Sequence, residues 1–331
     1  MLKKNLVIVI AIVIILAAVA AGAGFTWSQR PILGSGQDGV EFTIAPGSSL
    51  RGAMRQVAAA GVPVQPLGLE ALARLSGKGR RIKAGTYLLK PGTSPSGLVG
   101  QMARGEFLQV SLAVIEGWTF RQMRQAIAAH PGLKQDSAAL SDTELLARVA
   151  PGFTHAEGLF FPDTYRFAKG SSDLQVYRQA HALMMKRLEE GWATRAPDLP
   201  YKTPYEALTM ASIVEKETGA EAERPLIAGV FVNRLRRGML LQTDPTVIYG
   251  MGEAFQGDIR KRDLQSDTPY NTYLRAGLPP TPIALPGAAA LAAALHPAAT
   301  DALYFVSRGD GTSHFSTNLN DHSRAVNKFQ R

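Results

Sequence analysis

The chain opens with an unbroken apolar run from Leu6 to Phe25, preceded by Lys3 and Lys4. A helix needs about 20 apolar residues to cross the hydrocarbon core of a bilayer, so the run predicts one membrane-spanning helix. The basic residues before it predict that the N-terminus stays in the cytoplasm and that the rest of the chain is exported. A cleaved signal peptide is the alternative, but its apolar region would be only about 7–15 residues long. We therefore expect residues 1–27 to be a single-pass anchor in the cytoplasmic (inner) membrane.

The segment of residues 28–39 is rich in Pro, Gly and Ser, which predicts a linker. Within it, Gly34 to Gly39 fits the G-x-G-x-x-G pattern of dinucleotide-binding sites. That pattern binds a dinucleotide only where it follows a strand and opens a helix in a βαβ unit. Here it follows the apolar run, so we interpret the segment as a tether.

The next hydrophobic pattern predicts a small β-α-α-β module. Strands are expected at Val40–Ile44 and Ile82–Leu89, with helices at Leu50–Ala60 and Leu67–Leu75 between them. The order of strand, Pro-Gly-Ser turn and helix resembles the LysM-type glycan-binding modules. A spacer domain without ligand specificity is the alternative. Including a short helix that follows, we assign residues 40–105 to this LysM-like module.

From the hydrophobic pattern of the remaining chain, we expect residues 106–331 to form a larger second domain. A strand at Phe107–Ile115 precedes a helix at Phe120–Ala129, and residues 140–149 look less regular. The aromatic cluster within residues 158–167 indicates core packing. The expected fold class is thus α+β: one N-terminal transmembrane helix, a small LysM-like β-α-α-β module, and a larger α+β domain.

The amino-acid composition excludes several kinds of functional site. There is no Cys, which excludes disulfides, iron–sulfur clusters, Cys-ligated zinc and a cysteine nucleophile. The six His form no H-E-x-x-H or close i,i+4 pair, so no zinc site is predicted. The net charge of +9 suggests an anionic partner. Because the chain is expected to be exported, we expect lipid headgroups or cell-wall polymer as the partner and no nucleic acid. A basic surface that is simply solvated is the alternative.

The most informative stretch begins at Thr203, where Thr203-Pro204-Tyr205-Glu206 combines capping-box residues with Pro at the first helical position. A helix is predicted from there to Thr218. Near its end, Glu215 and Glu217 are two residues apart and therefore point about 200° apart. They cannot form the paired carboxyls of a glycosidase, which lie about 5–10 Å apart across one bond. One of them could be a lone catalytic acid, or both could be helix-end carboxylates that pair with Arg224 or Arg234.

A second amphipathic helix is predicted at Pro225–Arg237, and further polar motifs follow it. Taken together, the motifs resemble the endolytic murein transglycosylases of the YceG/MltG type. The resemblance covers nearly the whole chain. It rests on Ala211–Thr218, Val232–Leu235, Leu241–Gly250, Tyr270–Tyr273, Gly277–Pro280, His314–Ser316 and Asn318–His322.

The resemblance implies which glutamate is catalytic. In that family it is the second Glu of the E-K-E triplet, which is Glu217 here, and Glu215 becomes a supporting residue. The implied reaction is cleavage of the β-1,4 bond between N-acetylmuramic acid and N-acetylglucosamine in peptidoglycan, leaving 1,6-anhydro ends. It needs no metal and no cofactor. The resemblance also implies cell-wall synthases as partners and a role in terminating strand elongation.

The same motifs provide candidate substrate-binding residues, whose hydroxyl, amide and aromatic groups suit a sugar. Asp244 could instead cap a helix that begins at Pro245, and the tyrosines could simply pack. A hydrolytic muramidase and a non-catalytic wall-binding scaffold are the alternative functions. The candidates are Gln242, Thr243, Asp244, Tyr249, Tyr270, Asn271 and Tyr273.

Overall fold

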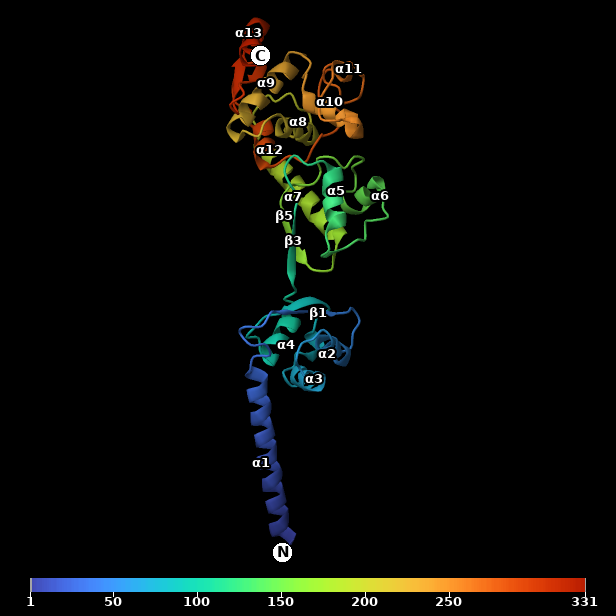
Figure 1. Ribbon diagram of the computed structural model, residues 1–331, viewed down its shortest axis with the longest axis vertical. Helices are drawn as coiled ribbons and strands as arrows, with labels where there is room; N and C mark the ends of the chain where they lie inside the picture. Colours follow the sequence, from blue (N-terminus) through green and yellow to red (C-terminus); the bar gives the residue numbers. More distant parts are fainter. Residues whose placement is uncertain (1, 331) are drawn as a thin grey trace. The chain divides into compact units, whose positions relative to one another are not determined.

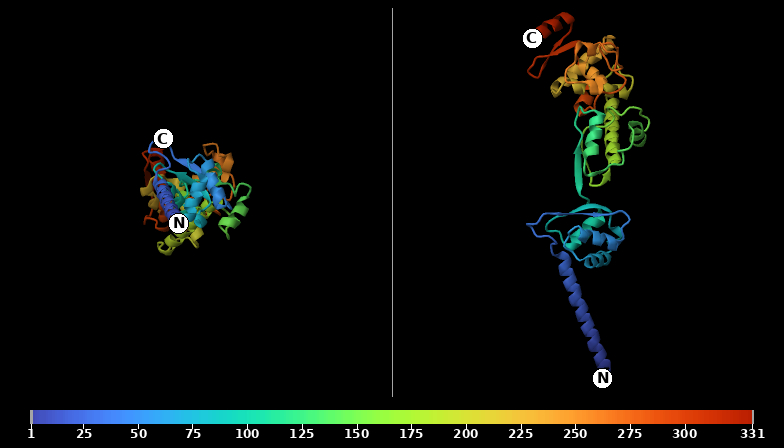
Figure 2. Two further views of the ribbon diagram at one scale, coloured as in Figure 1. Left: turned by 90° about the horizontal axis from the view of Figure 1, so that it is seen from below. Right: turned by 45° about the vertical axis from the view of Figure 1, so that its right-hand side comes forward.

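The computed structural model describes residues 2–330 and confirms a mixed α+β protein with an N-terminal apolar helix. The chain divides into two compact units. The first comprises residues 1–110 and 166–171, and the second comprises residues 111–165 and 172–331. Figures 1 and 2 show the elements of each unit.

The first unit begins with α1 (Leu2–Gln29), which is long and apolar enough to cross a membrane. The end of this helix packs directly on the rest of the unit. Ser28 and Leu33 are buried, and the Ile32 amide donates to the Thr93 carbonyl at 2.8 Å. The first part of the expected tether is therefore held against the module. In the described part of the chain, Gly34 to Gly39 lead into a strand and open no helix, which agrees with the non-nucleotide interpretation.

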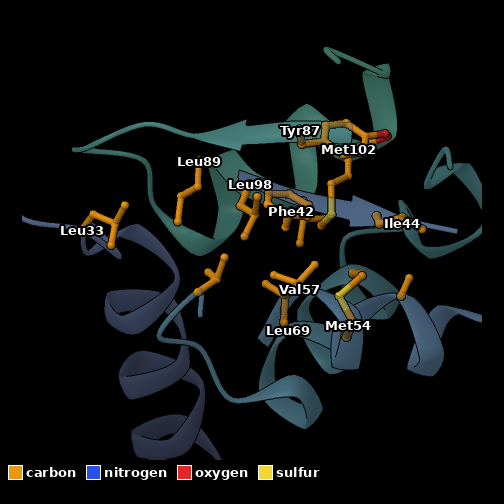
Figure 3. Packing of buried hydrophobic residues seen from close by; sticks show 14 residues of the cluster. Leu33, Phe42, Ile44, Met54, Val57, Leu69, Tyr87, Leu89, Leu98 and Met102 are labelled. Carbon is orange, nitrogen blue, oxygen red and sulfur yellow. The ribbon is translucent and has the colours of Figure 1, made fainter. Parts of the chain in front are cut away.

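The module has the expected β-α-α-β order. Its strands β1 (Val40–Ile44) and β2 (Gly85–Leu89) are antiparallel, with Phe42 opposite Tyr87. Helices α2 (Leu50–Ala59) and α3 (Pro66–Leu75) lie between them in sequence, followed by the short η1 (Gly79–Arg81). Helix α4 (Pro95–Arg104) follows β2. Figure 3 shows the core that these elements share, with Phe42 and Tyr87 stacked over Met54 and Leu69.

Short strand pairs follow. Strand β3 (Gln109–Ala113) pairs with β5 (Thr164–Ala168), and β4 (Leu133–Lys134) pairs with β6 (Ser171–Ser172). In the second unit, β7 (Tyr304–Ser307) and β8 (Ser313–Ser316) form an antiparallel hairpin.

The remainder of the second unit is helical. Helix α6 corrects the expectation of an irregular stretch at residues 140–149, because Ser141 and Glu144 form a reciprocal capping box that starts a helix. Helix α7, the longest described helix of this unit, was not among the predicted helices. The helical elements are α5 (Phe120–Ala129), α6 (Asp142–Val149), α7 (Asp173–Ala193), α8 (Pro204–Glu217), η2 (Glu221–Glu223), α9 (Arg224–Arg236), α10 (Asp244–Met251), η3 (Gly252–Ala254), α11 (Lys261–Leu264), α12 (Ala288–Leu295) and α13 (Leu319–Phe329).

Helix α8 forms the centre of this unit. Every residue from Ala207 to Val214 is buried, because α7, α9, α10 and α12 all pack on it (Figure 1). Thr203 caps its start by accepting the Glu206 amide, as the sequence predicts. The aromatic cluster of residues 158–167 is also core, since Phe160 stacks with Phe120 and contacts Tyr177 edge-on.

Candidate active site

The carboxyl of Glu217 lies at the end of α8 and accepts a hydrogen bond from the Thr243 hydroxyl. Burial raises its pKa to about 7, and the negative charge of Asp244 acts in the same direction. The bond from Thr243 and the positive charge of Arg234 oppose the rise in pKa. Near neutral pH, this carboxyl is therefore present in both its protonated and ionised forms.

Glu217 opens onto a cavity of about 490 Å³. The polar wall nearest to it contains Gln242, Asp244, Tyr273 and Arg234, and the hairpin β7–β8 and helix α13 complete the lining. The other lining residues are Phe231, Leu241, Tyr304, Phe305, Val306, Ser307, Ser313, Leu319, His322, Val326 and Gln330.

Backbone hydrogen bonds hold the segment that faces Glu217. The Gln242 amide donates to the Thr272 carbonyl, and the Thr243 amide donates to the Thr272 hydroxyl, both at 3.1 Å. Gln242 has a φ of 50°, in the left-handed region that non-glycine residues rarely occupy. This fixed turn leaves the Thr243 side chain, the N-cap residue of α10, free of any cap bond and able to bind Glu217.

Asp244 does not cap the helix, so that expectation is wrong. It is the first residue of α10, one position after the N-cap. Its carboxylate instead accepts a 2.6 Å hydrogen bond from the Tyr273 hydroxyl. Gln242, Thr243, Asp244 and Tyr273 are thus gathered around Glu217, three of them in the cavity wall and Thr243 buried behind it.

The other three candidates lie elsewhere in the unit and do not line this cavity. Asn271 is fully buried, and its amide donates to the carbonyls of Leu264 and Ser266. The rings of Tyr249 and Tyr270 meet edge-on at 4.8 Å. The Tyr249 hydroxyl donates to the Glu157 carboxyl, and the Tyr270 hydroxyl forms a 2.9 Å hydrogen bond with the Thr281 hydroxyl.

Glu215 has different partners from Glu217. Its two carboxylate oxygens accept from the Arg224 guanidinium at 3.2 Å and from the Gly287 amide at 2.9 Å. Burial raises its pKa. Gly287 is the N-cap of α12, and a Cβ there would lie 1.9 Å from a Glu116 oxygen, so the close approach needs glycine. Glu215 therefore joins α8, α9 and α12 and does not line the cavity.

Arg234 and His322 also line the cavity but were not among the candidate site residues. Arg234 is buried, and its guanidinium donates to the carbonyls of Leu303 and Leu241 while lying over the Tyr304 ring. His322 stacks on Tyr304, and burial lowers its pKa. Arg234 belongs to the Val232–Leu235 motif, so a sequence signal existed for it, but the motif does not say which way its side chain points.

The buried carboxyl of Glu157 was not among the candidates either. It accepts the Phe120 amide at 2.8 Å and the Tyr249 hydroxyl at 3.2 Å. Burial raises its pKa to about 7. Glu157 thereby ties the start of α5 to the end of α10, whose other end carries Asp244.

A carboxyl that is partly protonated near neutral pH and lies in the wall of a polar cavity is typical of enzymes that use general acid–base catalysis. The sequence profile of the YceG-like family matches residues 42–328, and the chain belongs to that family.

Individual proteins that are similar to this chain include two curated relatives and one solved structure. The chain is 33% identical over 266 residues to the endolytic murein transglycosylase of Bacillus subtilis (strain 168), covering 75% of this chain and 73% of the relative. It is 29% identical over 279 residues to a protein of the same name from Streptococcus pneumoniae serotype 2, and that match spans 74% of this chain but only 50% of the relative. Among solved structures, a YceG-like protein from Listeria monocytogenes matches with a TM-score of 0.56 and 29% identity, over 87% of this chain and 98% of the other.

Proposed function

We propose that the chain is an endolytic lytic transglycosylase that cleaves the β-1,4 bond between N-acetylmuramic acid and N-acetylglucosamine in peptidoglycan glycan strands. Its products would carry 1,6-anhydro-N-acetylmuramic acid ends. Cleavage of nascent strands would terminate their elongation. The names of the relatives support this activity.

Glu217 carries out both proton transfers in this proposal. In its neutral form it donates a proton to the glycosidic oxygen as the bond from that oxygen to C1 of the muramoyl residue breaks. In its ionised form it then takes the proton from the C6 hydroxyl of the same residue, and O6 bonds to C1. The carboxyl ends the cycle protonated, so no water and no cofactor are consumed.

The observation that carries the proposal is the pKa of about 7 for a carboxyl on the cavity wall. A lone acid–base group works best when its pKa lies near the working pH, because both forms are then accessible. Tyr273 and Gln242 provide hydroxyl and amide groups in the same wall for the hydroxyls and acetamido groups of the sugars.

Hydrolysis is the second candidate, and one observation favours it. Asp244 lines the same cavity as Glu217 and raises its pKa, so two carboxyl groups share this space. A hydrolytic muramidase uses such a pair, one carboxyl as acid and the other as base or nucleophile.

Digestion of uncrosslinked glycan strands in ¹⁸O-labelled water distinguishes the two reactions. Transglycosylation predicts products lighter by one water than reducing-end products, with no ¹⁸O at the new end. Reducing ends that contain ¹⁸O would show hydrolysis and overturn the proposed reaction. If the strands stay uncut by wild-type protein, the non-catalytic scaffold becomes the better account.

We also propose that α1 anchors the protein in the cytoplasmic membrane, with the second unit on the extracytoplasmic side. The length and apolar composition of α1 and the two lysines before it support this orientation. In the same proposal, the LysM-like module adds affinity for glycan and cell-wall synthases are partners of the enzyme.

A further inference from the structure

The net positive charge of the protein comes from one unit. The first unit holds 14 Lys and Arg against 4 Asp and Glu, whereas the second holds 22 against 23. Without Lys3 and Lys4, which precede the apolar run on the cytoplasmic side in the proposed orientation, the first unit still holds 12 against 4. The excess charge of the whole chain therefore belongs to the unit that contains α1, and the proposed catalytic unit is almost neutral. A basic module next to an apolar helix favours an anionic surface as its partner.

Helix α1 and the module are joined without a free linker. The Trp27 ring lies against Gly68 of α3, where an added Cβ would be 3.4 Å from the ring. Leu33 enters the module core, and its carbonyl accepts the Gly92 amide at 3.1 Å. The position of α1 therefore fixes the position of α3.

The contact at Trp27 sets the level of α3 relative to a membrane that α1 crosses. The apolar run ends at Phe25, and two more residues of helix rise only about 3 Å. The headgroup layer on each side of the hydrocarbon core is roughly 5–7 Å thick. Gly68 then lies at headgroup level, and Figures 1 and 2 show α3 beside the end of α1.

The outward face of α3 exposes large apolar side chains. Among the described residues beyond α1, five large apolar side chains are strongly exposed, and two of them are on α3: Leu67 at 67% and Leu75 at 88%. Arg74 lies on the same face at helical spacing and is exposed, with its guanidinium also paired with Glu70 at 2.7 Å. Lys78 lies beyond the end of α3, after the turn at Ser76 and Gly77, and is half-buried. The inward face, with Leu69 and Ala73, is buried in the module core.

We propose that this part of the module, made of Leu67, Arg74 and Leu75 on α3 and of Lys78 just after the helix, lies on the outer surface of the membrane and binds anionic phospholipid headgroups. The two leucines enter the interface, and the basic side chains pair with lipid phosphates, as in other interfacial helices. The contact holds the module against the membrane beside its own anchor. The inference rests on the proposed membrane anchor.

The chain contains no Cys, so one introduced cysteine can carry an environment-sensitive fluorophore. The full-length protein is reconstituted into vesicles of phosphatidylcholine alone and of phosphatidylcholine mixed with phosphatidylglycerol. With Leu75→Cys, we expect a blue-shifted emission that is quenched by a lipid-borne quencher, more strongly in the anionic vesicles. Thr43→Cys is the matched control, because Thr43 is exposed on β1 between the inward-facing Phe42 and Ile44, so its side chain points away from the core that α3 covers. That label should report water in both vesicles.

Removing the charge of Lys78 tests whether electrostatic attraction to anionic lipid contributes to the proposed binding. Lys78→Gln added to Leu75→Cys should lower the ratio of lipid-facing to water-facing label about fivefold, since each basic residue near an anionic surface contributes about that factor. Lys186→Gln removes one charge from an exposed side chain of α7 in the second unit and should leave the ratio unchanged.

Alkaline extraction of the same vesicles separates the two proposals. A protein that resists extraction while its Leu75→Cys label stays in water would overturn the lipid-binding face alone. A protein that is extracted would overturn the anchor, and the inference with it. A label that responds to purified peptidoglycan but not to lipid would assign the face to glycan and contradict the inference.

Discussion

The pKa of Glu217 depends on single contacts, and the contact with Thr243 is the one most open to change. Burial and Asp244 raise the pKa, while the Thr243 hydroxyl lowers it by donating to the ionised carboxylate. A hydrogen bond to the charged form of an acid favours that form. Removing this donor should therefore raise the pKa of Glu217 further.

Thr243→Val keeps the shape of the side chain and removes the donor. We expect the fall in cleavage rate at alkaline pH to move to higher pH, because Glu217 then stays protonated over a wider range. Thr243→Ser retains the hydroxyl and should keep the wild-type profile. The check is the dependence of kcat/KM on pH for the three proteins. A shift of the Val variant to lower pH would contradict the assigned effect of the bond.

At the scale of residues, the sequence predicts the relative directions of side chains on one helix but not the groups that they bind. The helical angle between Glu215 and Glu217 is enough to predict that they do not share a cleft, and the structure gives them separate partners. Which of the two faces a cavity depends on Gly287 and Thr243, which are distant in the chain. Only the family resemblance selects Glu217.

At the scale of elements, Glu157 links α5 to α10. The Phe120 amide and the Tyr249 hydroxyl both donate hydrogen bonds to its carboxyl. The carboxyl is buried, the bond from Phe120 is buried, and the bond from Tyr249 is partly buried. Because the start of α10 adjoins Glu217, the link helps to define where Asp244 and Thr243 stand. This role is structural, since Glu157 does not line the cavity.

Glu157→Ala should lower the free energy of unfolding by about 3 kcal/mol, because it leaves two donors without an acceptor. Glu157→Gln keeps an acceptor for the Phe120 amide and should cost less than about 1 kcal/mol. Urea unfolding of both variants at pH 6, where the wild-type carboxyl is largely neutral, measures the difference. Equal losses in the two variants would mean that packing at this position matters more than the acceptor.

Element boundaries follow local signals where these are strong. Thr203, Pro204 and Glu206 mark the start of α8, and the structure begins the helix at Pro204. The signal in α7 was present but passed over: Tyr177, Ala180, Met184 and Leu188 form its buried stripe at helical spacing. The strand pairs are short and join distant segments, so their pairing could not be deduced from local pattern.

For the whole molecule, the sequence predicts one apolar helix, a small module and a larger domain. The uneven distribution of charge is already visible in residues 1–110, which hold 12 Lys and Arg against 4 Asp and Glu, and residues 166–171 add Arg166 and Lys169 to the first unit. The net charge of the whole chain does not show this difference between the units, because the basic and acidic residues of the second unit are nearly equal in number.

Orientation in the membrane gives a further prediction. A reporter that is active only outside the cytoplasm, fused after Arg331, should be active, and the N-terminus of the membrane-bound protein should still include Lys3 and Lys4. Fusion activity together with N-terminal sequencing provides the check. A mature N-terminus near Gly24 would show a cleaved signal peptide, and a reporter active only when cytoplasmic would reverse the orientation.

The central claim is that Glu217 alone supplies the acid–base chemistry, and Glu215 provides the matched control two residues away. The decisive measurement is the cleavage rate of uncrosslinked glycan by Glu217→Gln and Glu215→Gln, each shown by thermal unfolding to be folded. We predict that Glu217→Gln loses at least about 10²–10⁴-fold in rate, because Gln can still accept the Thr243 bond but transfers no proton. Glu215→Gln should lose about 2 kcal/mol of stability through its weakened bond to Arg224 and keep its turnover. An active Glu217→Gln beside a folded but inactive Glu215→Gln would contradict the account.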